Sequence, residues 1–199
     1  TVQSFPELYR IVRQSVDATH SEGKLKAEIV RDPTPFVDVD EELPLALLDL
    51  KNAGKPFVLI TNSEWSYTRA MMRHVLDRLL PNGMTFRQLF DLVIVGARKP
   101  HFFETPTPAF RVVDDEADYL IPHVGPLVEG QAYFGGHASM VEKCLGIKGE
   151  EILYVGDHVY ADVHVSKSVL RWRTALVTRE LENELVALEN FMPKQAELT

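Results

Sequence analysis

Short apolar runs recur along this chain, each bounded by polar or turn-forming residues. Residues 57–60, 92–95 and 152–155 are runs of four apolar residues, and 174–177 contains three more. Runs of this length between turn signals are typical of buried strands. The pattern therefore predicts strands at these positions.

Amphipathic segments lie between the runs. Leu8, Val12 and Val16 recur at helical spacing over residues 5–20. Further helices are expected over 41–52, 65–80, 135–145 and 162–170, and from residue 180 onward. Strands that alternate with helices form mostly parallel sheets with helices on both faces. The chain is thus expected to have an α/β fold.

Residues 101–131 interrupt this alternation. The stretch is rich in proline and acidic residues, with short apolar runs around 110–113 and 119–121. Two short runs separated by a polar segment predict a β-hairpin inserted between the core strands.

Polar side chains follow three of the predicted strands. Thr61-Asn62-Ser63 follows the first, Lys99 follows the second, and Asp157 and Asp162 follow the third. In open α/β sheets, ligands bind at the carboxyl ends of the strands. Hydroxyl and amide groups can bind a phosphoryl oxygen, a lysine neutralises anions, and paired carboxylates suit Mg²⁺.

Each of these features also has an explanation without function. Ser63 or Asp157 could cap a helix, Asp162 could be a solvated helix residue, and Lys99 could lie on the surface. The combination, with one feature after each strand and in this order, is much rarer than its parts. It favours a phosphate and metal site.

The same order resembles the second, third and fourth motifs of the haloacid dehalogenase superfamily, and more closely the cytosolic purine 5'-nucleotidase family. The residues that carry the resemblance are Ile60-Thr61-Asn62-Ser63, 97–103, 155–162, Trp172-Arg173-Thr174, 12–20 and 24–26. It extends from about residue 5 to about residue 185.

The resemblance implies a doubly wound, mostly parallel sheet of the haloacid dehalogenase type. Residues 1–35 would form part of a helical cap with a substrate-contact segment, and 36–199 the core, with the hairpin at about 101–131. The implied activity is Mg²⁺-dependent hydrolysis of purine nucleoside monophosphates such as IMP or GMP through an aspartyl-phosphate.

Roles for individual residues follow from the same resemblance. Thr61, Asn62 and Lys99 would support catalysis, and Asp157 and Asp162 would hold Mg²⁺. The substrate-binding residues would be Arg13, Asp17, His20, Lys26 and Ser63.

Spacing alone places Arg13, Asp17 and His20 on one face of a helix, at i, i+4 and i+7. Arginine and histidine can donate to a purine oxygen or N7, and aspartate can accept from a ring N–H. An ion pair between Arg13 and Asp17 beside a surface histidine is the alternative.

The nucleophile of this superfamily is the first aspartate of an Asp-x-Asp motif on an opening strand. Asp38 and Asp40 have this spacing, but Pro33 and Pro35 interrupt the approach, and Glu42 stands where Thr or Val is expected. We therefore expect an upstream segment to carry the motif, and expect this chain, as a C-terminal portion, to be inactive alone. A non-catalytic nucleotide-binding or regulatory protein, or a phosphatase of another small organic phosphate, stays open.

Composition restricts the remaining classes. With 45% hydrophobic residues, the 199-residue chain can bury a substantial core. A formal net charge of -8 argues against binding to nucleic acid or to an anionic membrane. The single Cys144 excludes an internal disulfide and fits a reducing, cytoplasmic setting. The oligomeric state stays open, with a homo-oligomer as one option.

Overall fold

The computed structural model describes residues 4–197, apart from the side chains of residues 20, 21 and 197. Contacts between residues divide the chain into two compact units. The first contains residues up to 97, together with 109–124 and 128–135, and the second contains 98–108, 125–127 and the rest from 136 onward. The predicted boundary between cap and core near residue 35 stays a prediction.

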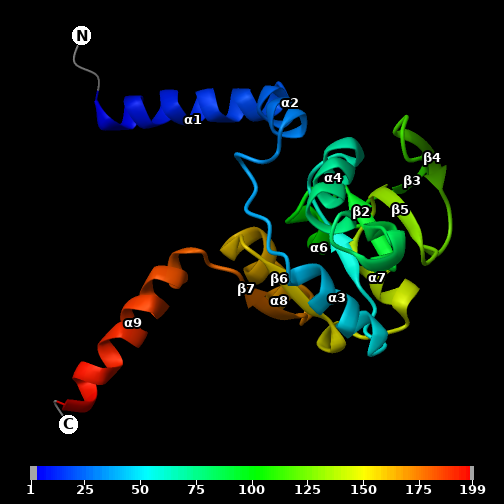
Figure 1. Ribbon diagram of the computed structural model, residues 1–199. Coiled ribbons are helices and arrows are strands. Elements are labelled where there is room, and N and C mark those ends of the chain that lie inside the picture. Colours follow the sequence, from blue (N-terminus) through cyan, green and yellow to red (C-terminus); the bar gives the residue numbers. More distant parts are fainter. Residues whose placement is uncertain (1–3, 198–199) are drawn as a thin grey trace. The chain divides into compact units, whose positions relative to one another are not determined.

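The first unit is built on a five-stranded sheet (Figure 1). In spatial order its strands are β1 (Val58–Ile60), β2 (Leu92–Val95), β5 (Gln131–Gly135), β3 (Ala109–Asp114) and β4 (Tyr119–His123). The first three are parallel, whereas β3 runs antiparallel to both β5 and β4. The α/β class is therefore confirmed, and the sheet is mixed.

The expected hairpin is present as β3 and β4. It does not stand apart from the core strands, because β3 also pairs with β5. The sequence pattern missed β5, in which the side chains of Ala132 and Tyr133 are fully buried. Its few apolar residues lie between the predicted hairpin, which ends at about residue 131, and the predicted helix, which begins at residue 135.

Helices accompany the sheet of the first unit. They are α1 (Phe5–Ser21), α2 (Lys24–Arg31), α3 (Leu43–Asn52), α4 (Trp65–Met72), the π-helical turn η1 (Arg73–Asp77), the 3₁₀ turn η2 (Pro81–Gly83) and α5 (Phe86–Leu89). The predicted helix over 65–80 is thus α4 continued by η1. Asn82, in the left-handed conformation with φ 57°, lies in the turn that follows.

The core of the first unit gathers around β2, whose four residues are all buried. The cluster contains Trp65, Leu76, Leu80, Phe86, Leu89, Val93, Val95, Val112 and Ala132. Val93 and Val95 alternate along the strand, so their side chains share one face of the sheet. Residues of α4, η1 and α5 cover that face.

The tip of the β3–β4 hairpin is attached to α4. The indole N–H of Trp65 donates to the carbonyl of Asp115 at 3.0 Å. The carboxylate of Glu116 forms ion pairs with the guanidinium groups of Arg69 and Arg73, with N–O distances of 3.0 and 2.9 Å. The hairpin is therefore held to the helix that directly follows the Thr61-Asn62-Ser63 segment.

Asp91 connects three segments of the first unit just before β2. One carboxylate oxygen accepts from the backbone N–H of Phe57 at 2.7 Å, and the other pairs with Lys51 at 2.7 Å. The carbonyl of Asp91 also accepts from the N–H of Gly130 at 2.6 Å. This half-buried residue thereby fixes the start of β1 and the end of α3 beside β2.

Replacing Asp91 with alanine leaves the Phe57 N–H and Lys51 without their acceptor, so we expect the free energy of unfolding to fall by about 2 kcal/mol. Urea denaturation measures this loss. Asp49→Ala, which changes an exposed side chain of α3, is the matched control and is expected to stay within about 0.5 kcal/mol. An equal effect of both substitutions would contradict the role assigned to Asp91.

The second unit contains a separate two-stranded parallel sheet of β6 (Leu153–Gly156) and β7 (Arg173–Leu176). Its helical segments are α6 (His101–Glu104), α7 (Ala138–Leu145), the 3₁₀ turn η3 (Gly149–Glu151), the π-helical turn η4 (Val159–His164), α8 (Val165–Leu170) and α9 (Glu180–Glu197). The strands predicted at 152–155 and 174–177 are thus confirmed. The doubly wound arrangement stays a prediction.

Aromatic rings form the centre of the second unit. Phe103 makes edge-on contacts with Tyr154 and Trp172, at centroid distances of 5.3 and 5.7 Å. The indole N–H of Trp172 donates to Glu142 at 2.7 Å, which satisfies the buried donor. By contrast, Leu153 and Val155 of β6 are more than half exposed, so only one face of this strand is covered.

The helices at the two ends of the described chain, α1 and α9, both present exposed apolar side chains. No helix within residues 4–197 is long and apolar enough to cross a membrane.

Candidate functional site

Lys99 and Asp162 meet in a buried ion pair within the second unit. The ammonium of Lys99 lies 2.8 Å from Asp162 Oδ1, and the two side chains are 15% and 4% exposed. The hydroxyl of Tyr154 lies between them: it accepts from Lys99 at 3.0 Å and donates to Asp162 Oδ1 at 3.1 Å. The structure thus brings two of the predicted site residues, Lys99 and Asp162, together within the second unit.

The loop after β6 is shaped to bring Asp162 back against the strand. A Cβ atom on Gly156 would lie 2.6 Å from Cβ of Asp162, so only glycine permits this approach. The backbone N–H of His158 donates to Asp162 Oδ2 at 3.2 Å. Asp162 lies in the π-helical turn η4, and the hydroxyl of Ser166 donates to the backbone carbonyl of Asp162.

Electrostatics keep Asp162 ionised. Burial by itself would raise the pKa of this carboxyl, but the hydrogen bond and charge of Lys99, with further donors from His158 and Tyr154, hold it below its ordinary value. Burial first, and then the neighbouring Asp162 charge, raises the pKa of Tyr154. Tyr154 is therefore protonated at neutral pH and acts as a donor.

Asp157 lies on the same loop but has a different environment. Its side chain is exposed, whereas both oxygens of Asp162 already accept hydrogen bonds from the protein. Within the described part of the chain, no group of three or more His, Cys, Asp or Glu side chains could hold a metal ion. The donor set fits Mg²⁺ in part, because this ion is commonly held by one or two carboxylates with water and substrate phosphate. Of the two carboxylates, Asp157 has the exposed side chain, whereas the oxygens of Asp162 are engaged by the protein.

The Thr61-Asn62-Ser63 segment belongs to the first unit, at the carboxyl end of β1. The Thr61 N–H donates to the carbonyl of Ile94 at 2.9 Å, and its own carbonyl accepts from Ala97 at 2.9 Å. Thr61 Oγ1 accepts from the Ser63 N–H at 3.1 Å, and the Ser63 carbonyl accepts from Gly96 at 2.8 Å. The loop is therefore fixed to the end of β2.

Arg13 and Asp17 lie on one exposed face of α1, as predicted. Their closest atoms are 3.8 Å apart, and the side chains are 67% and 69% exposed. Arg13 also donates to the Tyr9 hydroxyl at 3.3 Å. The alternative ion pair is therefore present in the structure. His20 lies in α1, but its side chain is outside the described residues.

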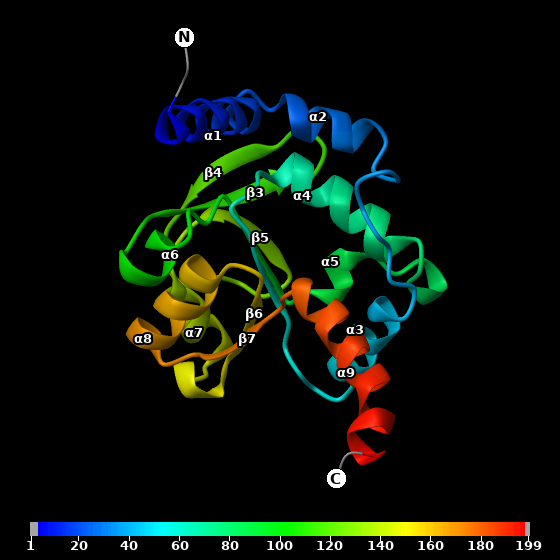
Figure 2. The ribbon, with the colours of Figure 1, turned by 90° about the vertical axis from the view of Figure 1, so that its left-hand side faces the viewer.

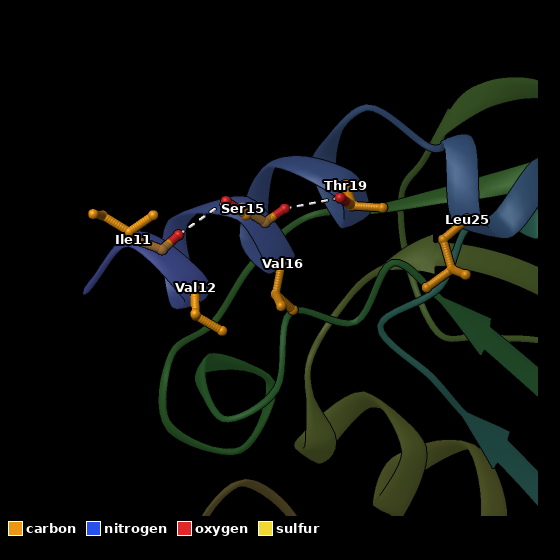
Figure 3. A pocket seen from close by; sticks show the side chains of 6 residues that line it. All are labelled: Ile11, Val12, Ser15, Val16, Thr19 and Leu25. Carbon is orange, nitrogen blue, oxygen red and sulfur yellow. Dashed lines mark hydrogen bonds between the residues drawn. The ribbon is translucent and has the colours of Figure 1, made fainter. Parts of the chain in front are cut away.

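A pocket along α1 is lined by residues other than the predicted substrate contacts. It has a volume of about 360 Å³ and is lined by Ile11, Val12, Ser15, Val16 and Thr19 of α1, and Leu25 of α2 (Figure 3). The hydroxyls of Ser15 and Thr19 donate to backbone carbonyls one turn earlier in the helix. The pocket is therefore an apolar hollow that includes none of the predicted substrate-binding residues.

Lys26 lies on α2, an element that the sequence pattern did not predict as a helix. Its ammonium is 2.6 Å from Glu64 Oε2 and 5.1 Å from the centre of the Tyr67 ring. Glu64 directly follows Ser63, so the structure brings Lys26 to the start of α4, where the Thr61-Asn62-Ser63 segment ends.

Asp38 and Asp40, which have the spacing of the nucleophile motif, lie in an irregular segment and not at the end of a strand. Asp40 Oδ1 accepts from the backbone N–H groups of Glu42 at 2.9 Å and Leu43 at 3.2 Å. Backbone N–H groups at the start of a helix have no acceptor within the helix, and Asp40 supplies one for these two. Asp40 therefore has the structural role of a helix cap.

Two residues of these clusters were missed from the sequence. Tyr154 lies within the apolar run 152–155, which predicts only a strand, and Glu64 lies at a helix start, where acids are common. One sequence signal could have indicated Tyr154. It lies two residues before Gly156, and residues two apart in a strand share one face, which here is the face toward Asp162.

Comparison with known proteins places the chain in a family. The model of the 5' nucleotidase family matches residues 1–199, and the chain belongs to this family. Over 189 residues it is 33% identical to the rat (Rattus norvegicus) protein 5'-nucleotidase domain-containing protein 2. The match covers 93% of this chain but 33% of the rat protein, so the chain spans about a third of that relative's length.

Removing the charge of Lys99 alone is expected to be costly. Lys99→Met leaves the buried Asp162 carboxylate without its counter-charge and should lower the free energy of unfolding by about 3 kcal/mol. The double variant Lys99→Met/Asp162→Asn should recover more than about 1 kcal/mol of this loss. Denaturant unfolding measures both, and purely additive effects would exclude coupling between the two side chains.

The bridging hydroxyl can be removed without disturbing the aromatic cluster. Tyr154→Phe keeps the ring contacts with Phe103 and Trp172 but deletes the donor to Asp162, so we expect a loss of about 1–2 kcal/mol in unfolding free energy. Tyr160→Phe, at an exposed position in η4, is the matched control and should be neutral. A neutral Tyr154→Phe would show that the bridge contributes nothing.

Proposed function

We propose that the protein containing this chain is a Mg²⁺-dependent 5'-nucleotidase of the haloacid dehalogenase type that hydrolyses purine nucleoside monophosphates. Membership of the 5' nucleotidase family supports the reaction class. The observation that carries the proposal is the buried Lys99–Asp162 pair, since Asp162 lies in the segment after β6 that also contains the exposed Asp157. A fixed cation and an open carboxylate near one strand end would suit a phosphate bound with a metal ion.

In this proposal Thr61 and Asn62 bind the transferring phosphoryl group. The backbone of their loop is fixed by hydrogen bonds to β2, so its polar groups do not have to be ordered when substrate binds. The side chain of Asn62 is exposed, so a ligand can reach it. Preorganised donors of this kind stabilise charge that develops in the transition state.

Lys99 would neutralise phosphate charge and keep the nucleophile ionised. An ammonium has three N–H donors, and Asp162 and Tyr154 accept from Lys99 at one side. The pair therefore fixes where the positive charge lies before substrate binds. Phosphoryl transfer depends mainly on such positioning and charge neutralisation.

Asp157 would ligate Mg²⁺ directly, and Asp162 would act through a water. When bound, the ion would supply charge stabilisation to the phosphate oxygens. The exposure of Asp157 and the filled hydrogen-bonding sites of Asp162 support this division of roles. A cytoplasmic location is part of the proposal, because the chain contains one cysteine.

The nucleophilic aspartate is proposed to lie in an upstream segment outside these 199 residues. Asp40 caps a helix, and Asp38 does not follow a strand, which argues against a nucleophile within the chain. The rat relative is about three times as long as the matched region, since that region covers 33% of it. Arg13, Asp17, His20, Lys26 and Ser63 are the proposed contacts for the nucleoside monophosphate.

Phosphate release from IMP and GMP in the presence of Mg²⁺ tests the function. The purified 199-residue chain is expected to release none, and the same chain extended by its upstream segment is expected to release phosphate until EDTA is added. Asp157→Asn in the extended protein should lower the rate at least about a hundredfold.

Two outcomes would overturn parts of this proposal. Release by the 199-residue chain that Asp157→Asn abolishes would place the nucleophile within it and return Asp38 to consideration. An extended protein that binds IMP but releases no phosphate would instead be a nucleotide-binding protein. Release from sugar phosphates but not from IMP or GMP would indicate another small organic phosphate as substrate.

A further inference from the structure

Lys26 of helix α2 contacts residues at the start of α4. Figure 2 shows the two helices as neighbours within the first unit, and residue contacts join them. At this contact, the Lys26 ammonium lies 2.6 Å from Glu64 Oε2 and over the ring of Tyr67 at 5.1 Å. The Lys26 side chain is 27% exposed, so most of its stem is covered.

Glu64 is well placed to control where the Lys26 ammonium lies. It is the residue before the first turn of α4 and directly follows Ser63. Glu64 is the N-cap residue of α4, but its carboxylate makes no capping hydrogen bond to the first turn of that helix. The hydrogen bond from Lys26 is the main cause that lowers the pKa of Glu64 below its ordinary value. The backbone N–H of Glu64 itself contributes next, so Lys26 is the first partner of this carboxylate.

The geometry leaves Lys26 able to bind a second anion. An ammonium carries three N–H donors, and Glu64 accepts from one side while the Tyr67 ring faces another. Fixing a long, flexible side chain in advance reduces the entropy that is lost when it binds a ligand. A carboxylate that competed with substrate for Lys26 would instead weaken binding.

We propose that Glu64, assisted by the ring of Tyr67, is a positioning residue that holds the Lys26 ammonium beside the Thr61-Asn62-Ser63 segment for the substrate phosphate. The inference rests on the proposed function and extends it, because it assigns a role to two residues outside the expected site. Glu64 acts through Lys26 and does not itself contact the substrate.

The test is a double-mutant cycle on IMP binding, measured by calorimetry in the protein extended by its upstream segment. Glu64→Gln keeps the size of the side chain but removes its charge, and should weaken IMP binding about two- to fivefold, as expected for one partly exposed ion pair. In the Lys26→Met background the same change should have no further effect.

The matched control is Glu22→Gln. Glu22 also pairs with a lysine of α2, Lys24, at 2.6 Å, but the Lys24 side chain is 79% exposed, whereas that of Lys26 is 27% exposed. This variant should leave IMP binding unchanged. In steady-state kinetics, Glu64→Gln should raise KM by the same factor as the affinity loss and leave kcat unchanged, a division that general destabilisation would not produce.

Each contrary result has a separate meaning. Tighter IMP binding by Glu64→Gln would show that the carboxylate competes with substrate for Lys26. Equal effects of Glu64→Gln with Lys26 present and with Lys26→Met would show that Glu64 acts independently of Lys26. Each of these results, obtained in a protein that still releases phosphate, would overturn the inference but not the proposed function. Coupled effects on binding without phosphate release would overturn the proposed hydrolysis alone. An extended protein that neither binds nor hydrolyses IMP would overturn both.

Discussion

The burial of one carboxylate governs the second unit. Taking Asp162 out of water is costly, and the cost is offset only if the charge is paired and its oxygens accept hydrogen bonds. Lys99 supplies the charge, and Tyr154 and the His158 N–H supply further donors. Removing any of these partners leaves the remaining groups poorly satisfied. The local structure around the loop is therefore largely determined by what Asp162 requires.

Several sequence features follow from that requirement. Gly156 is needed because any side chain would collide with Asp162. The aromatic ring of Tyr154 is fixed by Phe103, which places its hydroxyl between the two charges. Asp157, by contrast, lies one residue past the strand and stays exposed. A rigid buried pair thus supports an open carboxylate, which is the arrangement that the proposed phosphate chemistry needs.

The sequence predicted those parts of the fold that depend on local pattern. The strands at 57–60, 92–95 and 152–155 were recognisable because each is a continuous apolar run between turns. Strand β5 was missed because its burial comes from pairing with β2 and β3, which are distant in the chain. The mixed sheet, and the pairing of β6 with β7 in a sheet of their own, likewise depend on which strands pair. A local sequence pattern does not determine this.

Prediction of the site had the same limit. The order of motifs led to the expectation that Lys99 and Asp162 share a site, and the structure brings them together, while their catalytic roles stay predictions. The sequence did not predict roles for Tyr154 and Glu64, because a tyrosine in a strand and an acid at a helix start have common structural explanations. Their contacts with Lys99 and Lys26 join residues far apart in sequence, and only the fold reveals them.

The ionisation of Asp162 is the most direct test of this arrangement. Its carboxyl ¹³C signal can be followed by NMR during an acid titration of the folded chain, in parallel with Lys99→Met. If Lys99 holds the buried carboxylate ionised, the Asp162 signal will titrate with a midpoint below about 3.9, the ordinary pKa of an aspartate, and the variant will titrate at higher pH. A native Asp162 that titrates at or above the ordinary value, or a variant that titrates identically, would contradict the central role of the pair.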